Sequence, residues 1–222
     1  ITPMNEIKIS DSLIKKPTSG KVKKIVLFLH GYGADGADLL GISNYWIESL
    51  PDTIFYSPNA PFRCDANPVG YQWFKLSERT PQELESGLAE VEPYLETFIN
   101  YLLKIHNLDI SKLAVVGFSQ GTILSLYSLT KKNKACAGII GYSGLFFFNE
   151  KNKKQIKINF PILLHHGMND EVIDFNHTLN AESVLKKIGF DVSSHIQNNL
   201  GHGIDDSAVE MGKNFLKEVF EN

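Results

Sequence analysis

Residues 117–121 read Gly-Phe-Ser-Gln-Gly and place the hydroxyl of Ser119 between two glycines, in the pattern G-x-S-x-G. This pattern arises by chance in roughly 7% of chains of this length, so its context has to decide. It follows an apolar run at residues 113–116, predicted as a buried strand, and precedes a helical pattern that begins at Gln120. A tight strand–turn–helix connection pushes a serine hydroxyl into a cleft, and flanking glycines avoid collisions with the neighbouring strand or helix. We therefore predict that Ser119 is a nucleophile.

A serine hydroxyl attacks a carbonyl carbon only when a base removes its proton. Five histidines follow Ser119 in the chain: His165, His166, His177, His195 and His202. In this strand–turn–helix setting the chain order is the nucleophilic serine, then the acid, then the histidine. His202 is the preferred base, because it stands between two glycines in a loop after the last predicted strand. The other four fall in predicted strands or in a helix, and the first two come too early in this order.

The acid of such a triad orients the imidazole and stabilises the imidazolium. Asp170 closes the strand predicted at residues 162–166, which brings it to the carboxyl edge of the sheet. Asp174 is the rival, four residues further on, and Glu171 is adjacent but is expected to point elsewhere. We predict Asp170.

The negative oxygen of the intermediate needs two N–H donors. One should be the amide of Gln120, which follows the nucleophile, and the other the amide of Tyr32, in the loop after the first central strand. Gly31 and Gly33 let that backbone approach closely. His30 is interpreted as a structural hydrogen-bonding group.

Elements that could position these groups alternate along the chain. Short apolar runs typical of strands buried on both faces lie at residues 25–29, 53–57, 113–117, 137–142, 162–166 and 192–197. Amphipathic or apolar helical patterns lie at residues 88–105, 120–130, 176–188 and 205–219. Pro93 should start or kink the first helix, Gly189 should end the third, and Asp205 or Asp206 should cap the last. This alternation predicts an α/β fold with a mostly parallel sheet covered by helices on both faces.

The N-terminal residues Glu6 to Leu13 alternate roughly and predict an antiparallel outer hairpin arm. Several lysines follow, and they are interpreted as solvated protection of a sheet edge, with an anionic-membrane patch as the minor alternative: Lys15, Lys16, Lys21, Lys23 and Lys24. We expect one domain over residues 1–222, in which residues 1–3 could be a cloning remnant ahead of Met4.

Bulk properties limit the partners and the compartment. The net charge of −3 and the lack of a nucleic-acid motif argue against a polyanionic partner. The low number of cysteines, two, favours a reducing compartment. No apolar run approaches the roughly 20 residues that a membrane span needs. No leader pattern is expected at the start of the chain. We expect a cytoplasmic protein without stable membrane insertion.

The chain resembles the small carboxylesterase, lysophospholipase and acyl-protein thioesterase family of α/β-hydrolases, from about Ile25 to its end. The resemblance rests on F-L-H-G-Y-G at 28–33, P-N-A-P at 58–61, W-F at 73–74, G-F-S-Q-G at 117–121, H-G-M-N-D-E-V at 166–172 and G-H-G at 201–203. Two residues depart from it: Lys75 stands where the family usually has aspartate, and Thr122 where it often has glycine. The resemblance implies hydrolysis of small-molecule or lipid acyl esters without cofactor or metal, and it is compatible with a homodimer.

An acyl chain needs an apolar slot, and five large apolar residues are predicted on the active-site side: Phe62, Trp73, Phe74, Leu145 and Phe146. Ordinary core packing explains them equally well. For the activity, we expect a serine hydrolase of short- to medium-chain carboxylic esters. An acyl-protein thioesterase or lysophospholipase is the alternative; a catalytically inactive binding module, an acyltransferase and a peptide-cleaving enzyme are weaker ones.

Overall fold

The computed structural model describes residues 11–151 and 156–221. Its strands are β1 (Leu13–Lys15), β2 (Lys24–Leu29), β3 (Thr53–Ser57), β4 (Phe62–Arg63), β5 (Tyr71–Gln72), β6 (Leu113–Phe118), β7 (Gly138–Tyr142), β8 (Pro161–Gly167) and β9 (Asp191–Gln197). Its α-helices are α1 (Gly36–Leu40), α2 (Ser43–Trp46), α3 (Pro81–His106), α4 (Gln120–Leu129), α5 (Asn176–Ile188) and α6 (Asp206–Glu221). Short 3-10 turns follow at Ile47–Ser49 and Ile110–Lys112.

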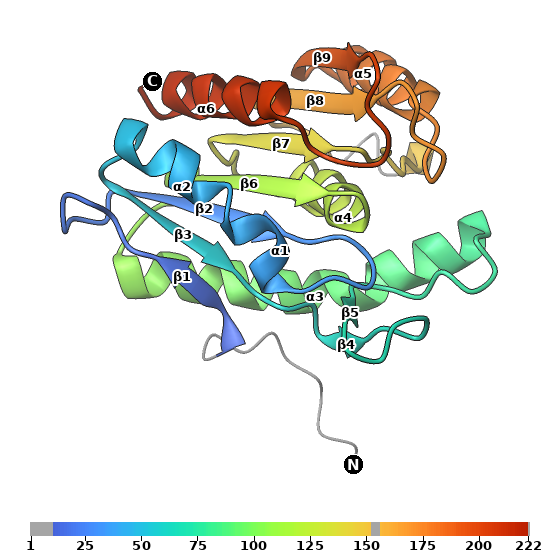
Figure 1. The fold of residues 1–222 in the computed structure, drawn as a ribbon, viewed down its shortest axis with the longest axis horizontal. Coiled ribbons are helices and arrows are strands. Elements are labelled where there is room, and N and C mark those ends of the chain that lie inside the picture. Colours follow the sequence, from blue (N-terminus) through green and yellow to red (C-terminus); the bar gives the residue numbers. More distant parts are fainter. Residues whose placement is uncertain (1–10, 152–155, 222) are drawn as a thin grey trace.

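Seven strands form one sheet in the order β1-β3-β2-β6-β7-β8-β9 (Figure 1). All neighbours are parallel except β1, which pairs antiparallel with β3. The mostly parallel sheet and the antiparallel N-terminal arm are therefore confirmed. The strand of the arm lies at Leu13–Lys15, later than expected, and Glu6–Ser10 and residues 1–3 lie outside the described residues.

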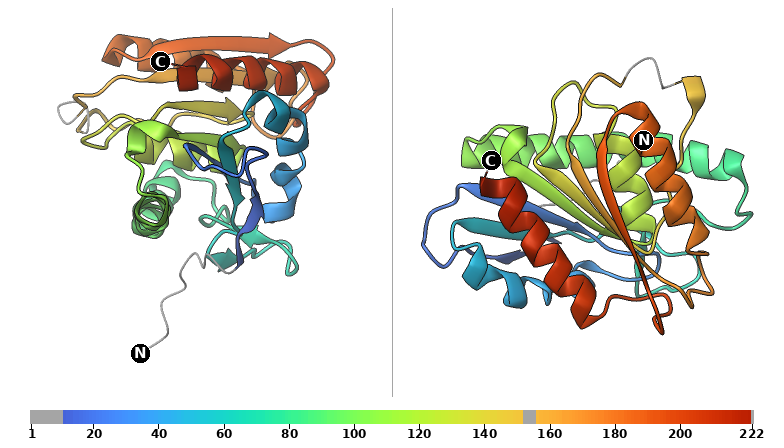
Figure 2. Two further views of the ribbon diagram at one scale, coloured as in Figure 1. Left: turned by 90° about the vertical axis from the view of Figure 1, so that its left-hand side faces the viewer. Right: turned by 90° about the horizontal axis from the view of Figure 1, so that it is seen from above.

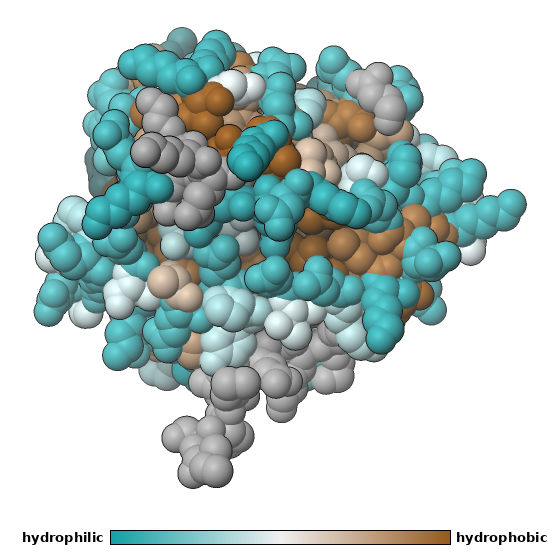
Figure 3. All heavy atoms as spheres, turned by 180° about the vertical axis from the view of Figure 1, so that it is seen from behind, coloured by the Kyte–Doolittle hydropathy of each residue, from teal (hydrophilic) through white to brown (hydrophobic). Residues whose placement is uncertain are grey.

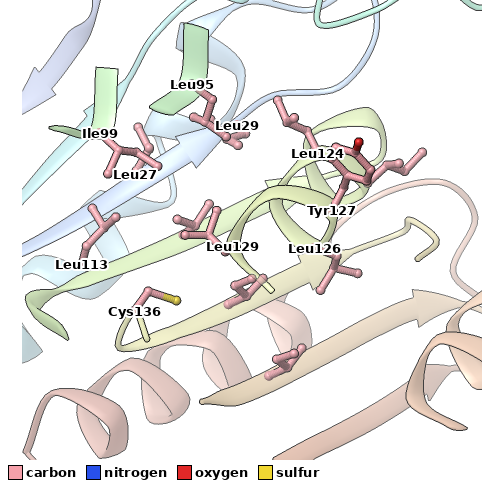
Figure 4. Packing of buried hydrophobic residues seen from close by; sticks show 14 of the residues in the cluster. Leu27, Leu29, Leu95, Ile99, Leu113, Leu124, Leu126, Tyr127, Leu129 and Cys136 are labelled. Carbon is pink, nitrogen blue, oxygen red and sulfur yellow. The ribbon is translucent and has the colours of Figure 1, made fainter. Parts of the chain in front are cut away.

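Helices cover both faces of the sheet, as Figure 2 shows. Successive residues of a strand point to opposite faces. Ile25, Leu27 and Leu29 of β2 therefore join a core with α3, α4 and α5, while Val26 and Phe28 join a second core with α1, α2 and α6. In Figure 4, the side chains of the first core from β2, β6, α3 and α4 point toward one another.

The prediction that α3 starts or kinks at Pro93 was wrong about its start. The helix begins at Pro81, where Thr80 caps it through a hydrogen bond from the Glu83 amide, and it continues through Pro93. Proline removes the N–H that would bond the carbonyl four residues earlier, on Ala89. Both residues are exposed, so water can satisfy that carbonyl.

The other helix ends follow the predicted signals. Gly189 ends α5 with φ of 117°, a conformation that suits glycine. The side chain of Asp205 accepts a hydrogen bond from the Ala208 amide at the start of α6. Among the described residues, no helix is both long and apolar enough to cross a bilayer.

Candidate active site

Ser119 occupies the tight turn between β6 and α4, near the carboxyl edge of the sheet. Its φ of 54° and ψ of −114° lie in a region that non-glycine residues avoid, at a cost of about 1–3 kcal/mol. The Ser119 amide donates to the Tyr142 carbonyl at 2.9 Å and helps to hold this backbone. The strained turn predicted from the glycine pattern is present.

The two glycines of the turn are required by close packing. A Cβ on Gly121 would lie 1.9 Å from the carbonyl oxygen of Leu29 at the end of β2. A Cβ on Gly117 would lie 2.5 Å from the backbone nitrogen of Thr122 in α4. The collisions anticipated from the sequence therefore involve both the neighbouring strand and the following helix.

Thr122, the residue that departs from the family pattern, is accommodated by another glycine. A Cβ on Gly144 would approach the Thr122 Cβ to 2.5 Å, so glycine there leaves room for threonine. The Thr122 hydroxyl donates to the Tyr142 carbonyl at 2.8 Å. The same carbonyl thus holds both the Ser119 amide and the first turn of α4.

His202 bridges Ser119 and Asp170. Its Nε2 lies 3.1 Å from the Ser119 Oγ, and its Nδ1 lies 2.7 Å from Asp170 Oδ2. A carboxylate only accepts hydrogen bonds, so Nδ1 carries the proton and Nε2 presents a lone pair to the hydroxyl. The structure thus brings together the three residues predicted as a triad.

Asp170 is fully buried at its side chain but well supplied with donors. Burial alone would raise its pKa, yet hydrogen bonds from His202 and from the Ile173 and Val172 amides lower it overall. Asp174, the rival, instead accepts from the Asn176 amide at the start of α5. Asp170 is therefore held as the ionised partner of His202.

The loop that carries His202 is joined to the loop after β8. The Met168 amide donates to the Gln197 carbonyl and the Asn169 amide to the Leu200 carbonyl, each at 2.8 Å. A Cβ on Gly167 would lie 2.2 Å from the carbonyl oxygen of Gly201. Glycine at 167 therefore allows the close approach that brings His202 over the sheet edge.

The two amides predicted as oxyanion donors belong to different segments. Gln120 begins α4 directly after Ser119, and Tyr32 lies in the loop after β2. In the described part of the chain, neither N–H donates to a backbone carbonyl. Both donors thus stay available, as an oxyanion hole requires.

A hairpin formed by β4 and β5 holds the loop that contains Tyr32. The Gly33 amide donates to the Tyr71 carbonyl, and the Tyr71 amide donates to the Ala34 carbonyl, each at 2.8 Å. The Asn67 side chain donates to the Gly33 carbonyl at 2.8 Å. Backbone contacts on both sides therefore fix the course of this loop.

The side chain of Gln120 ties the start of α4 to the segment after β5. Its Oε1 accepts from the Trp73 amide and its Nε2 donates to the Phe74 carbonyl, both at 2.7 Å in a buried environment. Sequence reasoning assigned a role only to the Gln120 amide. The two-way side-chain contact had no separate signal in the sequence.

His30 forms buried hydrogen bonds and does not reach Ser119 or Asp170 by any described contact. The Ala60 amide donates to its Nε2, so Nδ1 carries the proton toward the Gly31 carbonyl at 2.7 Å. Burial lowers the pKa of His30. Its structural interpretation agrees with these contacts.

The predicted acyl-binding residues separate into two groups. Trp73 and Phe74 are 0% and 2% exposed and belong to the core, where the indole of Trp73 donates to the His30 carbonyl. This burial favours the core-packing explanation for both. The remaining three keep partly exposed side chains at the rim of the same core: Phe62, Leu145 and Phe146. Figure 3 shows hydrophobic atoms reaching one face in patches separated by hydrophilic side chains.

His166 is a contact of the site that sequence reasoning missed. It was set aside because it precedes Asp170 in the chain, yet its Nε2 lies 3.1 Å from Asp170 Oδ2. The spacing of four residues within H-G-M-N-D could have raised this possibility.

Comparisons with known proteins agree with this arrangement. The family model described as phospholipase/carboxylesterase matches residues 11–220. Esterase YpfH of Escherichia coli (strain K12) is 25% identical over 93% of this chain and 88% of its own length. Acyl-protein thioesterase 1 of Emericella nidulans is 24% identical over 91% of this chain and 93% of its own.

Solved structures show the same fold. The crystal structure of esterase PE8 is 34% identical, has a TM-score of 0.90, and aligns over 94% of this chain and 98% of its own. SOBER1 of Arabidopsis thaliana has a TM-score of 0.73 at 23% identity, over 88% and 98% of the two chains.

Fold, site geometry and the match of the family model over nearly the whole chain agree: the chain belongs to the phospholipase/carboxylesterase family of ester hydrolases within the α/β-hydrolase superfamily.

Proposed function

We propose that this chain hydrolyses carboxylic esters of short- to medium-chain acids through an acyl-enzyme on Ser119. The observation that carries the proposal is the continuous hydrogen-bonded series from Ser119 Oγ through His202 to Asp170. A base oriented by a buried carboxylate is what a serine hydroxyl needs to become nucleophilic.

In the proposed mechanism, His202 Nε2 takes the Ser119 proton while Oγ bonds to the carbonyl carbon of the ester. The negative charge on the carbonyl oxygen is received by the amides of Tyr32 and Gln120. Asp170 stabilises the resulting imidazolium, which then gives its proton to the departing alcohol. Water attacks the acyl-enzyme by the same route and releases the acid and Ser119.

Phe62, Leu145 and Phe146 are proposed to contact the acyl chain, since they are the predicted apolar residues that keep exposed surface. A thioester is the second candidate substrate, because relatives that match nearly the whole chain are named acyl-protein thioesterase 1. The proton transfers would be the same, with a thiol leaving in place of an alcohol. A small-molecule or lipid acyl compound is thus the proposed substrate, and a single catalytic domain acting in the cytoplasm remains our expectation.

The decisive experiment measures turnover of p-nitrophenyl esters and labelling by a fluorophosphonate probe in wild type and in Ser119→Ala. The variant should lose on the order of 10⁴-fold or more in kcat and should not label. A variant that keeps most of its activity would refute the role of Ser119. Absence of labelling in the wild type would instead favour a binding module.

Ser128→Ala is a matched control. Ser128 lies in α4, which follows Ser119 directly; it is fully buried, and its hydroxyl has no hydrogen-bond partner among the described residues. The same atom is removed from the same residue type, and kcat should remain within about twofold, as for a substitution away from the reacting groups. A chain-length series with matched oxygen esters and thioesters then separates the two substrate classes.

A further inference from the structure

Asp170 Oδ2 is shared by two histidines. His202 Nδ1 lies 2.7 Å from this oxygen, and His166 Nε2 approaches it to 3.1 Å from the end of β8. The side chains of both His166 and Asp170 are 0% exposed. Asp170 Oδ1 is occupied separately by the Val172 and Ile173 amides. Each oxygen of the carboxylate therefore lies within 3.1 Å of two N–H groups.

The partners of His166 assign its protons. Its Nε2 is hydrogen-bonded to the Ile173 carbonyl at 2.7 Å and also lies 3.1 Å from the Asp170 carboxylate, and both groups only accept. Nε2 therefore carries a hydrogen. Nδ1 lies 2.7 Å from the Thr178 hydroxyl of α5, which can donate to the lone pair of a neutral ring. The contact with α5 thus fixes both the orientation and the tautomer of His166.

Other charged groups around His166 are few. Asp170 and Asp174 attract a proton to it, while His165 and His202 oppose its protonation. Burial is the largest influence and lowers the pKa of His166, against the opposing effects of Ile173 and Asp170. The ring is therefore a neutral donor at neutral pH.

We propose that His166 is a positioning residue for the triad, which fixes Asp170 Oδ2 toward His202 and limits how strongly that oxygen attracts the imidazole proton. This inference rests on the proposed function of Ser119, His202 and Asp170. Two N–H groups close to one oxygen both stabilise its negative charge, so the second weakens the pull of that oxygen on the first. Thr178 takes part indirectly by holding the ring of His166.

The test compares four variants in a p-nitrophenyl ester assay over pH 5–9, with thermal unfolding to verify folding. His166→Leu removes the donor, and kcat should fall about 10- to 100-fold while KM stays within about twofold. The acid limb of its pH–rate profile should move upward by about half a unit to one unit, because Asp170 then attracts the His202 proton more strongly.

His166→Gln keeps an N–H donor at similar reach and should restore kcat to within about fivefold of wild type. Thr178→Val leaves the ring without its anchor, and about a three- to tenfold loss in kcat is expected. His165→Leu is the matched control: the same change one residue away, equally buried but on the opposite face, should leave kcat within about twofold.

A folded His166→Leu with wild-type kcat and pH profile would overturn the inference, as would equal losses in the Leu and Gln variants or a downward move of the acid limb. If His166→Leu does not fold, Thr178→Val becomes the test. An unchanged kcat and pH profile of Thr178→Val would then overturn the inference. Failure of the proposed function is recognised separately, by an active Ser119→Ala.

Discussion

His165 is buried without a hydrogen-bond partner among the residues that the structure describes, and this should make the fold sensitive to acid. It lies on β8, is 0% exposed, and neither ring nitrogen has a partner among the described residues. Its ring contacts the edge of Tyr142 at 5.9 Å and the ring of His195 at 5.3 Å between centroids. Burial lowers the pKa of His165 from 6.5 to about 4, with Asp205 opposing the change and His195 and His166 adding to it.

The size and direction of the effect follow from linkage. Above pH 6.5 the ring is neutral in both the folded and the unfolded chain. Between pH 6.5 and about 4 the unfolded chain binds a proton that the folded chain does not, so stability falls as pH falls. Each pKa unit corresponds to about 1.36 kcal/mol, so the loss attributable to His165 is about 3 kcal/mol. That is a large part of the 5–15 kcal/mol typical of a folded protein.

His165→Leu removes this proton-binding site and should flatten the acid dependence. Urea unfolding at pH 7.5, 6.5, 5.5 and 4.5, followed by the fluorescence of buried Trp46 and Trp73, gives the free energies of both proteins. The variant should lie within about 1 kcal/mol of wild type at pH 7.5, because the replaced nitrogens make no hydrogen bond to any described residue. Its advantage should grow to between 2 and 3 kcal/mol, roughly, at pH 4.5.

Other histidines with lowered pKa, such as His30 and His106, are present in both proteins and cancel in the difference. Parallel curves, with the difference changing by less than about 1 kcal/mol, would refute the reasoning. Such a result would mean that the ring is not held neutral in the folded state.

Two further substitutions test how the site is held together. Gln120→Ala leaves the Trp73 amide and the Phe74 carbonyl buried without their partner, so the free energy of unfolding in urea should fall by about 2–4 kcal/mol. A fall of less than about 1 kcal/mol would show that the Gln120 side chain does not hold this segment. Gly167→Ala places a Cβ 2.2 Å from the Gly201 carbonyl and should displace the loop of His202, so kcat should fall about 100-fold; wild-type kcat in a folded variant would show that the loop yields elsewhere.

The local pattern of the sequence predicted most of the fold. Continuous apolar runs marked β2, β3, β6, β7 and β8, because strands buried on both faces cannot alternate with polar residues. The end of α5 followed from Gly189. The start of α3 did not follow from Pro93, because the exposure of the proline, which decides whether its missing hydrogen bond is costly, is a tertiary property.

For the candidate active site too, some features followed from the sequence and others only from the tertiary structure. Chain order, glycine spacing and the carboxyl ends of parallel strands were enough to select Ser119, Asp170 and His202, because the topology of a parallel sheet brings those ends to one edge. Whether Trp73 and Phe74 face the substrate or the core could not be read from their types, since an aromatic residue suits both.

What the sequence determined by itself is therefore the set of reacting groups and the edge at which they meet, since backbone periodicity and chain order are local properties. Only the tertiary structure decided which groups support them. His166 and His165 are neighbours of the same type in one strand. His166 lies 3.1 Å from Asp170 Oδ2 and is hydrogen-bonded to the Ile173 carbonyl, whereas neither ring nitrogen of His165 has a partner among the described residues. The physical reason is that alternate strand residues face opposite layers, and the packing of α5 or α6 against each face sets what each ring meets.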